Sequence, residues 1–284
     1  MRLIRFGQSG QEKPGVLLKD GTRLDVSAAT KDYDEAFFSG DAIESLRKWL
    51  DKNESTAPRV PASTRLGPPI SRPSKIVCIG LNYQAHAGES QMEVPTEPVV
   101  FFKSPSSLSG PFDPVMIPRN GKKVDWEVEM AVVVGKKAAY LESKHAMEHV
   151  AGYFILNDYS ERAFQLERGG QWVKGKSADT FAPVGPFLAT QDEIPDPNAL
   201  DIWLKVNGEI RQKSNTTHMI FDVPTLVAYL SQFMTLLPGD IISTGTPAGV
   251  GLGMKPPTYL KAGDVVELGV GGLGESRQEI VAPR

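Results

Sequence analysis

The sequence of 284 residues contains one cysteine, no run of basic residues and no long apolar segment. A single cysteine excludes a disulfide framework and favours a reducing, cytoplasmic setting. With a net charge of −3 and no basic tail, the chain is poorly suited to bind nucleic acid or an anionic membrane. No segment is long enough to span a membrane, and the first residues lack the apolar core of a signal peptide. A globular cytoplasmic protein is therefore expected.

The composition and the apolar pattern favour a β-rich fold. There are 27 glycines and 22 prolines without a repeating period, which is typical of a turn-rich, strand-rich chain. Strand signals predominate, and Asn207-Gly208 between two alternating runs predicts a hairpin turn. Strands and helices do not alternate, so a doubly wound parallel sheet is excluded. Beyond residue 70, strands are predicted at 75–80, 98–103, 124–135, 152–158, 201–212, 240–245, 264–270 and 277–281, and helices at 84–92, 143–149, 160–168 and 224–233.

The first part of the chain has a different organisation. Short strand signals are followed by an amphipathic helix at 41–53, with Asp41 as its predicted N-cap. Residues 55–74 are rich in Pro and Ser, which favours an extended linker. We therefore predict a small N-terminal domain with its linker at 1–70 and a larger domain at 71–284.

An unusual set of acids lies in the segment 124–135, "VDWEVEMAVVVG". On a continuous strand, Asp125, Glu127 and Glu129 would share one face. Asp158 ends another apolar strand, so its carboxylate is expected to converge with them. A half-exposed strand with solvated acids is one interpretation. The other is a site for Mg²⁺, Mn²⁺ or Ca²⁺, because converging carboxylates repel unless a cation neutralises them.

Two further segments are candidates for chemistry. In "GLNYQAHAGES", His86 and Glu89 lie three residues apart and would share a helix face, so that Glu89 could orient His86 as a general base. A surface contact is the alternative, and Gly88 suggests a mobile lid. The glycine-rich loop "STGTPAGVGLG" could bring backbone N–H groups and the Thr246 hydroxyl to a small anion, or serve only as a turn.

Two motifs are misleading. "GGQWVKGKS" has the spacing of a phosphate-binding loop, but no buried strand precedes Lys176 and prolines after it forbid the helix that such a loop requires. "HAMEH" matches a zinc-peptidase pattern at His145 and His149, yet the surrounding segment is short and charged and no third ligand follows. Cys78 lies in an apolar strand without a base or cation nearby, which is typical of a buried thiol.

Several of these segments together resemble one family. "GLNYQAHAGES", "FFKSPSSL", "DWEVEMAVVVG", "GYFILNDYSERAFQ", "KGKSADTFAPVGP" and "TGTPAGVG" occur in the order seen in the fumarylacetoacetate hydrolase family. The resemblance extends from Pro73 to the C-terminus, and the N-terminal region is only loosely similar. It implies a mixed β-sheet roll, one Mg²⁺ or Mn²⁺ per chain and a homodimer, with a small N-terminal α+β domain.

The resemblance also implies roles for individual residues. Asp125 is not a metal ligand in the family pattern. It is expected to accept a hydrogen bond from a group next to the ligands without touching the metal itself. The implied metal ligands are Glu127, Glu129 and Asp158, the catalytic residues are His86, Glu89 and Lys176, and the substrate-binding residues are Arg162, Gln165 and Thr246.

The implied reaction is metal-dependent hydrolysis of a C–C bond in a 2,4-dioxo acid, which gives a pyruvate-type acid and a second carboxylic acid. The segment 168–188 most resembles bacterial members that act on 2,4-dioxo-3-deoxy acids derived from fuconate or rhamnonate. An oxaloacetate decarboxylase or tautomerase and a ureidoglycolate lyase-type enzyme are alternatives on the same site. A metal-binding protein without turnover is disfavoured, because mere binding has no use for the base His86.

Overall fold

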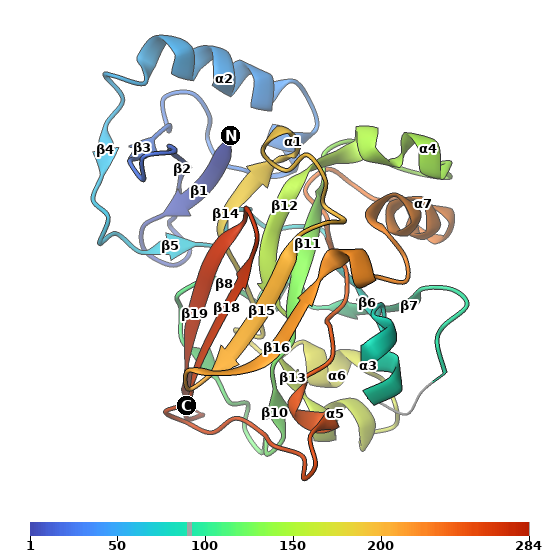
Figure 1. The fold of residues 1–284 in the computed structure, drawn as a ribbon. Helices are drawn as coiled ribbons and strands as arrows, with labels where there is room; N and C mark the ends of the chain where they lie inside the picture. Colours follow the sequence, from blue (N-terminus) through green and yellow to red (C-terminus); the bar gives the residue numbers. More distant parts are fainter. Residues whose placement is uncertain (90–92, 284) are drawn as a thin grey trace.

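The computed structural model describes residues 1–89 and 93–283. Its main feature is a mixed sheet with the strand order β4-β3-β2-β1-β14-β12-β11-β17-β6-β7, to which β5 and β8 are attached (Figure 1). The strands are β1 (Arg2–Phe6), β2 (Lys13–Leu17), β3 (Arg23–Asp25), β4 (Arg59–Val60), β5 (Leu66–Gly67), β6 (Ile76–Gly80), β7 (Val99–Lys103), β8 (Leu108–Ser109), β11 (Val128–Val134), β12 (Val150–Asn157), β14 (Ala182–Thr190) and β17 (Ile241–Ser243). The β-rich α+β prediction is confirmed.

Two smaller sheets complete the fold. One has the order β16-β15-β18-β19-β9, and the other pairs β10 with β13. The predicted hairpin turn is confirmed, since Asn207 and Gly208 both have positive φ angles, 52° and 81°. The strands are β9 (Val115–Met116), β10 (Val124–Asp125), β13 (Ser160–Glu161), β15 (Asp201–Val206), β16 (Glu209–Asn215), β18 (Val265–Val270) and β19 (Gly274–Val281).

The helices in the described residues are short. They are α1 (Glu35–Phe38), α2 (Ala42–Asn53), α3 (Gln84–Glu89), α4 (Ser143–Ala146), α5 (Arg162–Leu166), α6 (Val173–Lys176) and α7 (Val223–Phe233), with 3₁₀ turns at Pro105–Ser107, Met147–His149, Gln191–Glu193, Thr216–His218 and Gly251–Gly253. Asp41 does precede α2, but its side chain makes no capping hydrogen bond. The predicted N-cap position is therefore confirmed without the capping bond, because the Asp41 backbone, at φ −87° and ψ 24°, is not extended as in a typical capping residue.

Two other predicted helices differ from the observed ones. The predicted helix 84–92 is observed as α3 to Glu89, and residues 90–92 lie outside the described part. The predicted helix 160–168 is shorter, because residues 160–161 pair with β10 before α5 begins. None of the helices in the described residues is long and apolar enough to cross a membrane.

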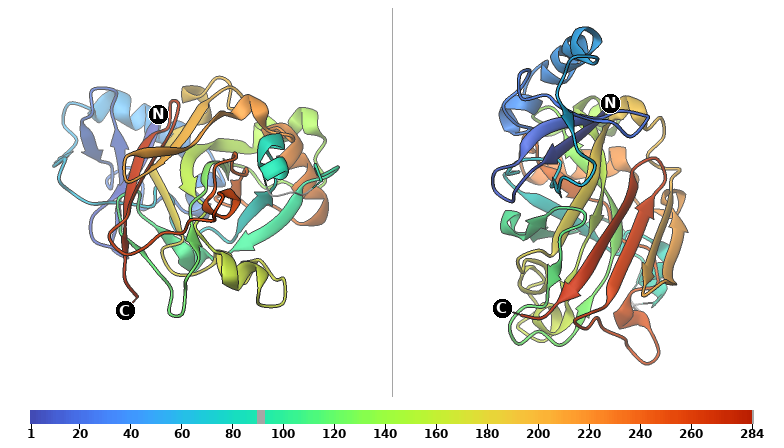
Figure 2. Two further views of the ribbon diagram at one scale, coloured as in Figure 1. Left: turned by 60° about the horizontal axis from the view of Figure 1, so that its bottom comes forward. Right: turned by 90° about the vertical axis from the view of Figure 1, so that its left-hand side faces the viewer.

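The strand β11 is buried on both faces. Val128, Met130 and Val132 pack into the cluster shared with the second sheet, while Ala131 and Val133 face the cluster on the other side. The β18 and β19 ribbons run alongside the long strands (Figure 2, right), and the strands surround the interior when viewed from the end that carries α5 and α6 (Figure 2, left). Polar side chains on β11 therefore lie inside the protein rather than in water.

The N-terminal region continues the main sheet. Strand β1 pairs antiparallel with β14, with Arg2 opposite Ala189 and Leu3 opposite Leu188. Strands β2 to β4 extend the sheet from there, and α2 lies above them (Figure 1). The division into domains 1–70 and 71–284 stays a prediction, and the sheet crosses the proposed boundary.

A buried acid cluster beside a candidate active-site cavity

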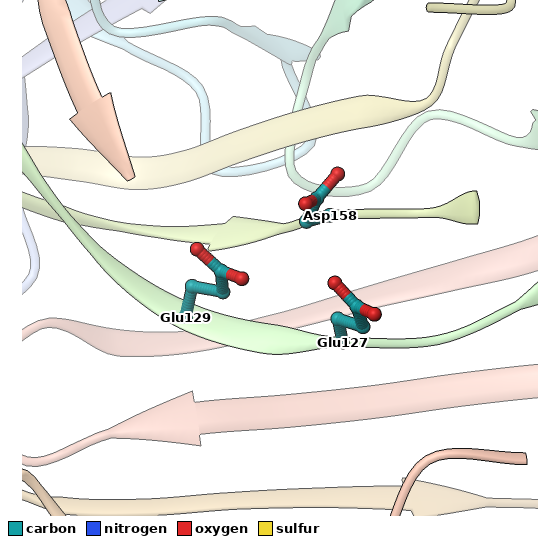
Figure 3. A group of neighbouring side chains, drawn as sticks. All are labelled: Glu127, Glu129 and Asp158. Atoms are coloured by element: carbon teal, nitrogen blue, oxygen red, sulfur yellow. The ribbon is translucent and has the colours of Figure 1, made fainter. Parts of the chain in front are cut away.

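Three carboxylates meet where β11 and β12 lie side by side. Glu127 immediately precedes β11, Glu129 is its second residue, and Asp158 follows β12. One carboxylate oxygen from each lies within 4.8 Å of the others, and Figure 3 shows Glu127 and Glu129 on one stretch of the chain, with Asp158 beside them. All three side chains are buried. Solvated acids on an outer face are therefore excluded.

Asp125 does not join this acid cluster of Glu127, Glu129 and Asp158. The predicted continuous strand is interrupted between Asp125 and Val128, and the amide of Glu127 bonds the Asn157 side chain at 3.0 Å instead of a neighbouring strand. The expectation of three acids on one face is therefore wrong for Asp125. Its carboxylate accepts from the backbone N–H groups of Gly251 and Leu252.

Three buried cations contact the acid cluster. Lys176 Nζ lies 2.7 Å from both Glu127 and Asp158. Lys103 Nζ lies 2.6 Å from Asp158. Arg162 donates to Glu127 at 2.6 Å and to Asp125 at 2.9 Å, so Asp125 helps to orient a neighbour of the cluster.

The charges shift the pKa values in opposite directions. Burial alone would raise the pKa of Glu127, but Lys176 and Arg162 outweigh it and hold that pKa below its usual range. Burial together with the carboxylates of Asp158 and Glu127 raises the pKa of Glu129 well above its usual range. Within the described residues, no ion pair involves Glu129, which accepts from Ser243 Oγ at 2.5 Å and Gly245 N at 2.9 Å.

The lack of a cation partner for Glu129 among the described residues fits a site for a divalent cation. The cluster offers oxygen ligands only, which suits Mg²⁺ or Mn²⁺ better than Zn²⁺. Glu129 is buried beside two like charges, and a cation held between the three acids would relieve that repulsion. The residues present therefore fit the implied ion.

The predicted dyad lies on α3. His86 Nδ1 is 3.3 Å from Glu89 Oε2, and Gly249 N donates to the Glu89 carboxylate at 3.1 Å. A Cβ atom on Gly253 would lie 2.3 Å from the Glu89 side chain, so the glycine-rich loop must approach closely at that position. The dyad is thus attached to the loop that follows β17.

One cavity of about 360 Å³ unites these groups. It is lined by every predicted site residue except Asp158. The Gln165 amide oxygen accepts from Arg162 at 3.0 Å. The Thr246 hydroxyl is occupied within the protein, since it donates to Val128 O at 2.9 Å and accepts from Gln212 at 2.7 Å.

Sequence reasoning missed several residues of the site. Lys103 could have been found from the sequence, because it ends the apolar strand "VVFFK" and a lysine is rarely buried in such a position. Ser243 ends β17 beside Glu129, and Phe101 and Trp172 line the cavity. No local pattern pointed to these three.

Neither misleading motif, nor Cys78, has the structural surroundings that its apparent chemistry would require. Lys176 ends the one-turn helix α6, and β14 rather than a helix follows. The His145 side chain is 53% exposed and pairs with Glu148 at 3.0 Å. Cys78 is buried, and burial raises the pKa of its thiol.

The comparisons identify the class of protein. The family model for the fumarylacetoacetate (FAA) hydrolase C-terminal domain matches residues 75–281. The chain therefore belongs to the fumarylacetoacetate hydrolase family, as the sequence predicted.

Three relatives show how far the similarity extends. A Burkholderia multivorans protein named "Putative hydrolase" is 51% identical over 285 residues, covering 100% of both chains. Fumarylacetoacetate hydrolase from Exiguobacterium antarcticum has a TM-score of 0.86 at 38% identity over 99% of both chains. Maleylpyruvate hydrolase from Sphingobium sp. SYK-6, solved with manganese(II) and pyruvate, has a TM-score of 0.84 at 33% identity over 100% of both. These similarities support a hydrolase that acts on acylpyruvate-like substrates.

Proposed function

We propose that the protein is a metal-dependent hydrolase that cleaves the C–C bond between the 3- and 4-positions of a 2,4-dioxo acid. The observation that carries the proposal is a single cavity lined both by Glu127 and Glu129 of the acid cluster and by the His–Glu dyad, with no cation paired to Glu129 in the described chain. The Sphingobium relative, solved with manganese(II) and pyruvate, supports this combination of ion and product. The fuconate- and rhamnonate-derived dioxo acids are the proposed substrates within this class.

Glu127, Glu129 and Asp158 would hold Mg²⁺ or Mn²⁺, one ion per chain. When bound, the ion supplies Lewis-acid stabilisation of the negative charge that develops on the 2-oxo group. Lys176 lies beside two of these acids, so its ammonium adds positive charge where the substrate's 2-oxo acid end is placed. Among the described residues, Gln165 uses its carbonyl oxygen for Arg162 and keeps its amide N–H groups for a substrate oxygen.

His86 would act as the general base, oriented by Glu89. It takes a proton from water as the water oxygen bonds to the 4-carbonyl carbon. The bond between carbons 3 and 4 then breaks, and its electron pair forms the enolate of the pyruvate-type product. Return of the proton from His86 to carbon 3 completes pyruvate, while carbon 4 leaves as a carboxylic acid.

The test uses chelator-treated protein, a panel of 2,4-dioxo acids, oxaloacetate and ureidoglycolate. Loss of the enol absorbance and release of pyruvate are followed with and without Mg²⁺ or Mn²⁺. We expect dioxo-acid cleavage that depends on the ion. Full activity in metal-stripped protein contradicts the proposal, and turnover of oxaloacetate alone would favour a decarboxylase.

The family resemblance further leads us to propose a homodimer, and the single cysteine a cytoplasmic setting. Sedimentation of the full chain at several concentrations tests the dimer, which predicts twice the mass of 30.9 kDa.

A further inference from the structure

One wall of the cavity is apolar and rigidly packed. It consists of Ile79, Phe101 and Trp172, which we call the apolar wall. Trp172 packs edge-on against Phe101, with ring centroids 5.4 Å apart at 63°. A Cβ atom on Gly80 would lie 2.8 Å from the Trp172 ring, so the strand β6 makes room for this indole.

The apolar wall begins next to the charged part of the cavity. Lys176 Nζ lies 4.9 Å from the centre of the Phe101 ring and 2.7 Å from two acids of the cluster. A substrate with its 2-oxo acid end at the acid cluster therefore has the apolar wall available for the remainder of the molecule. Leu166, which is 48% exposed, also lines the cavity.

The cations of the cavity are already paired. Among the described lining residues, the permanently charged cations are Arg162 and Lys176. Arg162 is bound by Asp125 and Glu127, and Lys176 by Glu127 and Asp158. A carboxylate at the far end of a substrate would lie against the apolar wall without a cation of its own, and burial of an unpaired charge is strongly unfavourable.

We propose that the apolar wall receives a compact, uncharged substrate tail, so the protein prefers monocarboxylic acylpyruvates to dicarboxylic ones such as maleylpyruvate. The inference rests on the proposed function, because it assumes that the 2-oxo acid end binds at the acid cluster. The small cavity favours a short tail. A tail with a methyl end and one hydroxyl fits it, since the Gln165 amide can serve one such group.

Binding of two matched, uncleavable acids tests the proposal directly. 2-Oxoglutarate and 5-methyl-2-oxohexanoate have the same chain and lack a 4-oxo group, but an isopropyl group replaces the distal carboxylate in the second. Calorimetric titration of the Mn²⁺-loaded protein is expected to give at least about tenfold tighter binding of the isopropyl compound. Equal or tighter binding of 2-oxoglutarate overturns the proposal.

A charge introduced at Leu166, a partly exposed lining residue of the same cavity, provides the second test. Leu166→Arg supplies a cation, and Leu166→Gln is a polar control without a charge. We expect Leu166→Arg to reduce the preference for the isopropyl compound by about tenfold or more, and Leu166→Gln to leave the ratio within about threefold. The same ratio in Leu166→Arg as in Leu166→Gln would contradict a tail placed at this wall.

Turnover measurements distinguish failure of the substrate-tail inference from failure of the proposed hydrolase function. The specificity constants for acetylpyruvate and maleylpyruvate are compared in the same protein. Faster cleavage of acetylpyruvate supports the inference, and faster cleavage of maleylpyruvate overturns it while leaving the hydrolase function intact. Failure to cleave either acid, together with failure to bind either 2-oxo acid, overturns the proposed function itself.

Discussion

The ion pairs of the N-terminal region and those around the acid cluster differ in burial and in whether every acid has a cation partner. In the N-terminal network, Arg65 pairs with Glu12 and Asp113, and Arg5 pairs with Asp32. Arg65 is 29% exposed, so water still reaches this network. Around the acid cluster, the paired side chains are at most 6% exposed.

The two groups of charges are also matched differently. Each acid of the N-terminal network contacts a guanidinium, and the pair of Arg65 with Asp113 joins the N-terminal region to the rest of the chain. In the acid cluster, Glu129 shares its surroundings with two other carboxylates, and its donors in the described part of the chain are a hydroxyl and a backbone amide. Buried charges that destabilise the folded protein are typically retained where they serve a function. Three substitutions among these charges and one in the neighbouring dyad test the two regions, beginning with the largest expected effects.

The first substitution is Glu129→Gln. Removal of one acid should weaken Mn²⁺ binding and dioxo-acid cleavage by more than about 100-fold. Even substitution of a residue that only hydrogen-bonds to a metal ligand typically lowers metal affinity or activity by about 10- to 100-fold. The metal-free variant should melt no lower than metal-free wild type, because glutamine resembles the protonated carboxyl that the raised pKa of Glu129 favours. Calorimetry and thermal melting by circular dichroism measure the two effects. Unchanged metal affinity would disprove the ligand assignment.

The second substitution is His86→Ala, which removes the base without touching the acid cluster. We expect C–C hydrolysis to fall about 10²–10⁴-fold, the usual range for a lost general base. Any oxaloacetate decarboxylation should fall much less, because carbon dioxide leaves without an attacking water. Steady-state rates of both reactions in one preparation decide the point. Hydrolysis at the wild-type rate would show that the dyad assignment is wrong.

The third substitution is Lys103→Met, which leaves Lys176 as the remaining cation beside Asp158 in the described chain. Removal of one partner of a fully buried pair should reduce the free energy of unfolding by about 3–5 kcal/mol. Mn²⁺ should restore part of the loss, because it supplies positive charge to Asp158. Denaturant unfolding with and without the ion measures both effects. Lys144→Met, at an exposed pair with Glu142, is the control and should cost less than about 1 kcal/mol.

The fourth substitution is Arg65→Gln in the N-terminal network. The pairs with Glu12 and Asp113 are partly exposed, so their loss should cost only about 1 kcal/mol. The specificity constant for the best dioxo acid should not change. A loss as large as that of Lys103→Met would remove the distinction between the two groups of charges.

The sequence predicted the individual strands better than their arrangement. Alternating apolar residues and the Asn207-Gly208 turn are local signals, and both led to the observed elements. The pairing of β1 with β14, more than 180 positions away, depends on which buried faces fit together. No local pattern encodes that fit, so the continuity of the sheet into the N-terminal region could not be predicted.

The acids of the site were predicted from the sequence, but their partners on other strands were not. The acids of 124–135 and Asp158 were visible because charged residues at the ends of apolar strands are rare. The error at Asp125 came from a strand break, where the Asn157 side chain replaces a backbone partner of Glu127. Lys103 and Ser243 reach the acids from strands β7 and β17, and only the folded sheet brings them together.

The position of β17 has a consequence for the order of folding. This strand lies between β11 and β6, with Ile241 opposite both Val133 and Ile76. During synthesis, β6 and β11 are made long before the strand that joins them, so the sheet is split until residues 241–243 have left the ribosome. Ser243 and Gly245, which bind Glu129, arrive with them. The acid cluster is thus completed late, when loop closure over more than 100 residues has brought the two halves together.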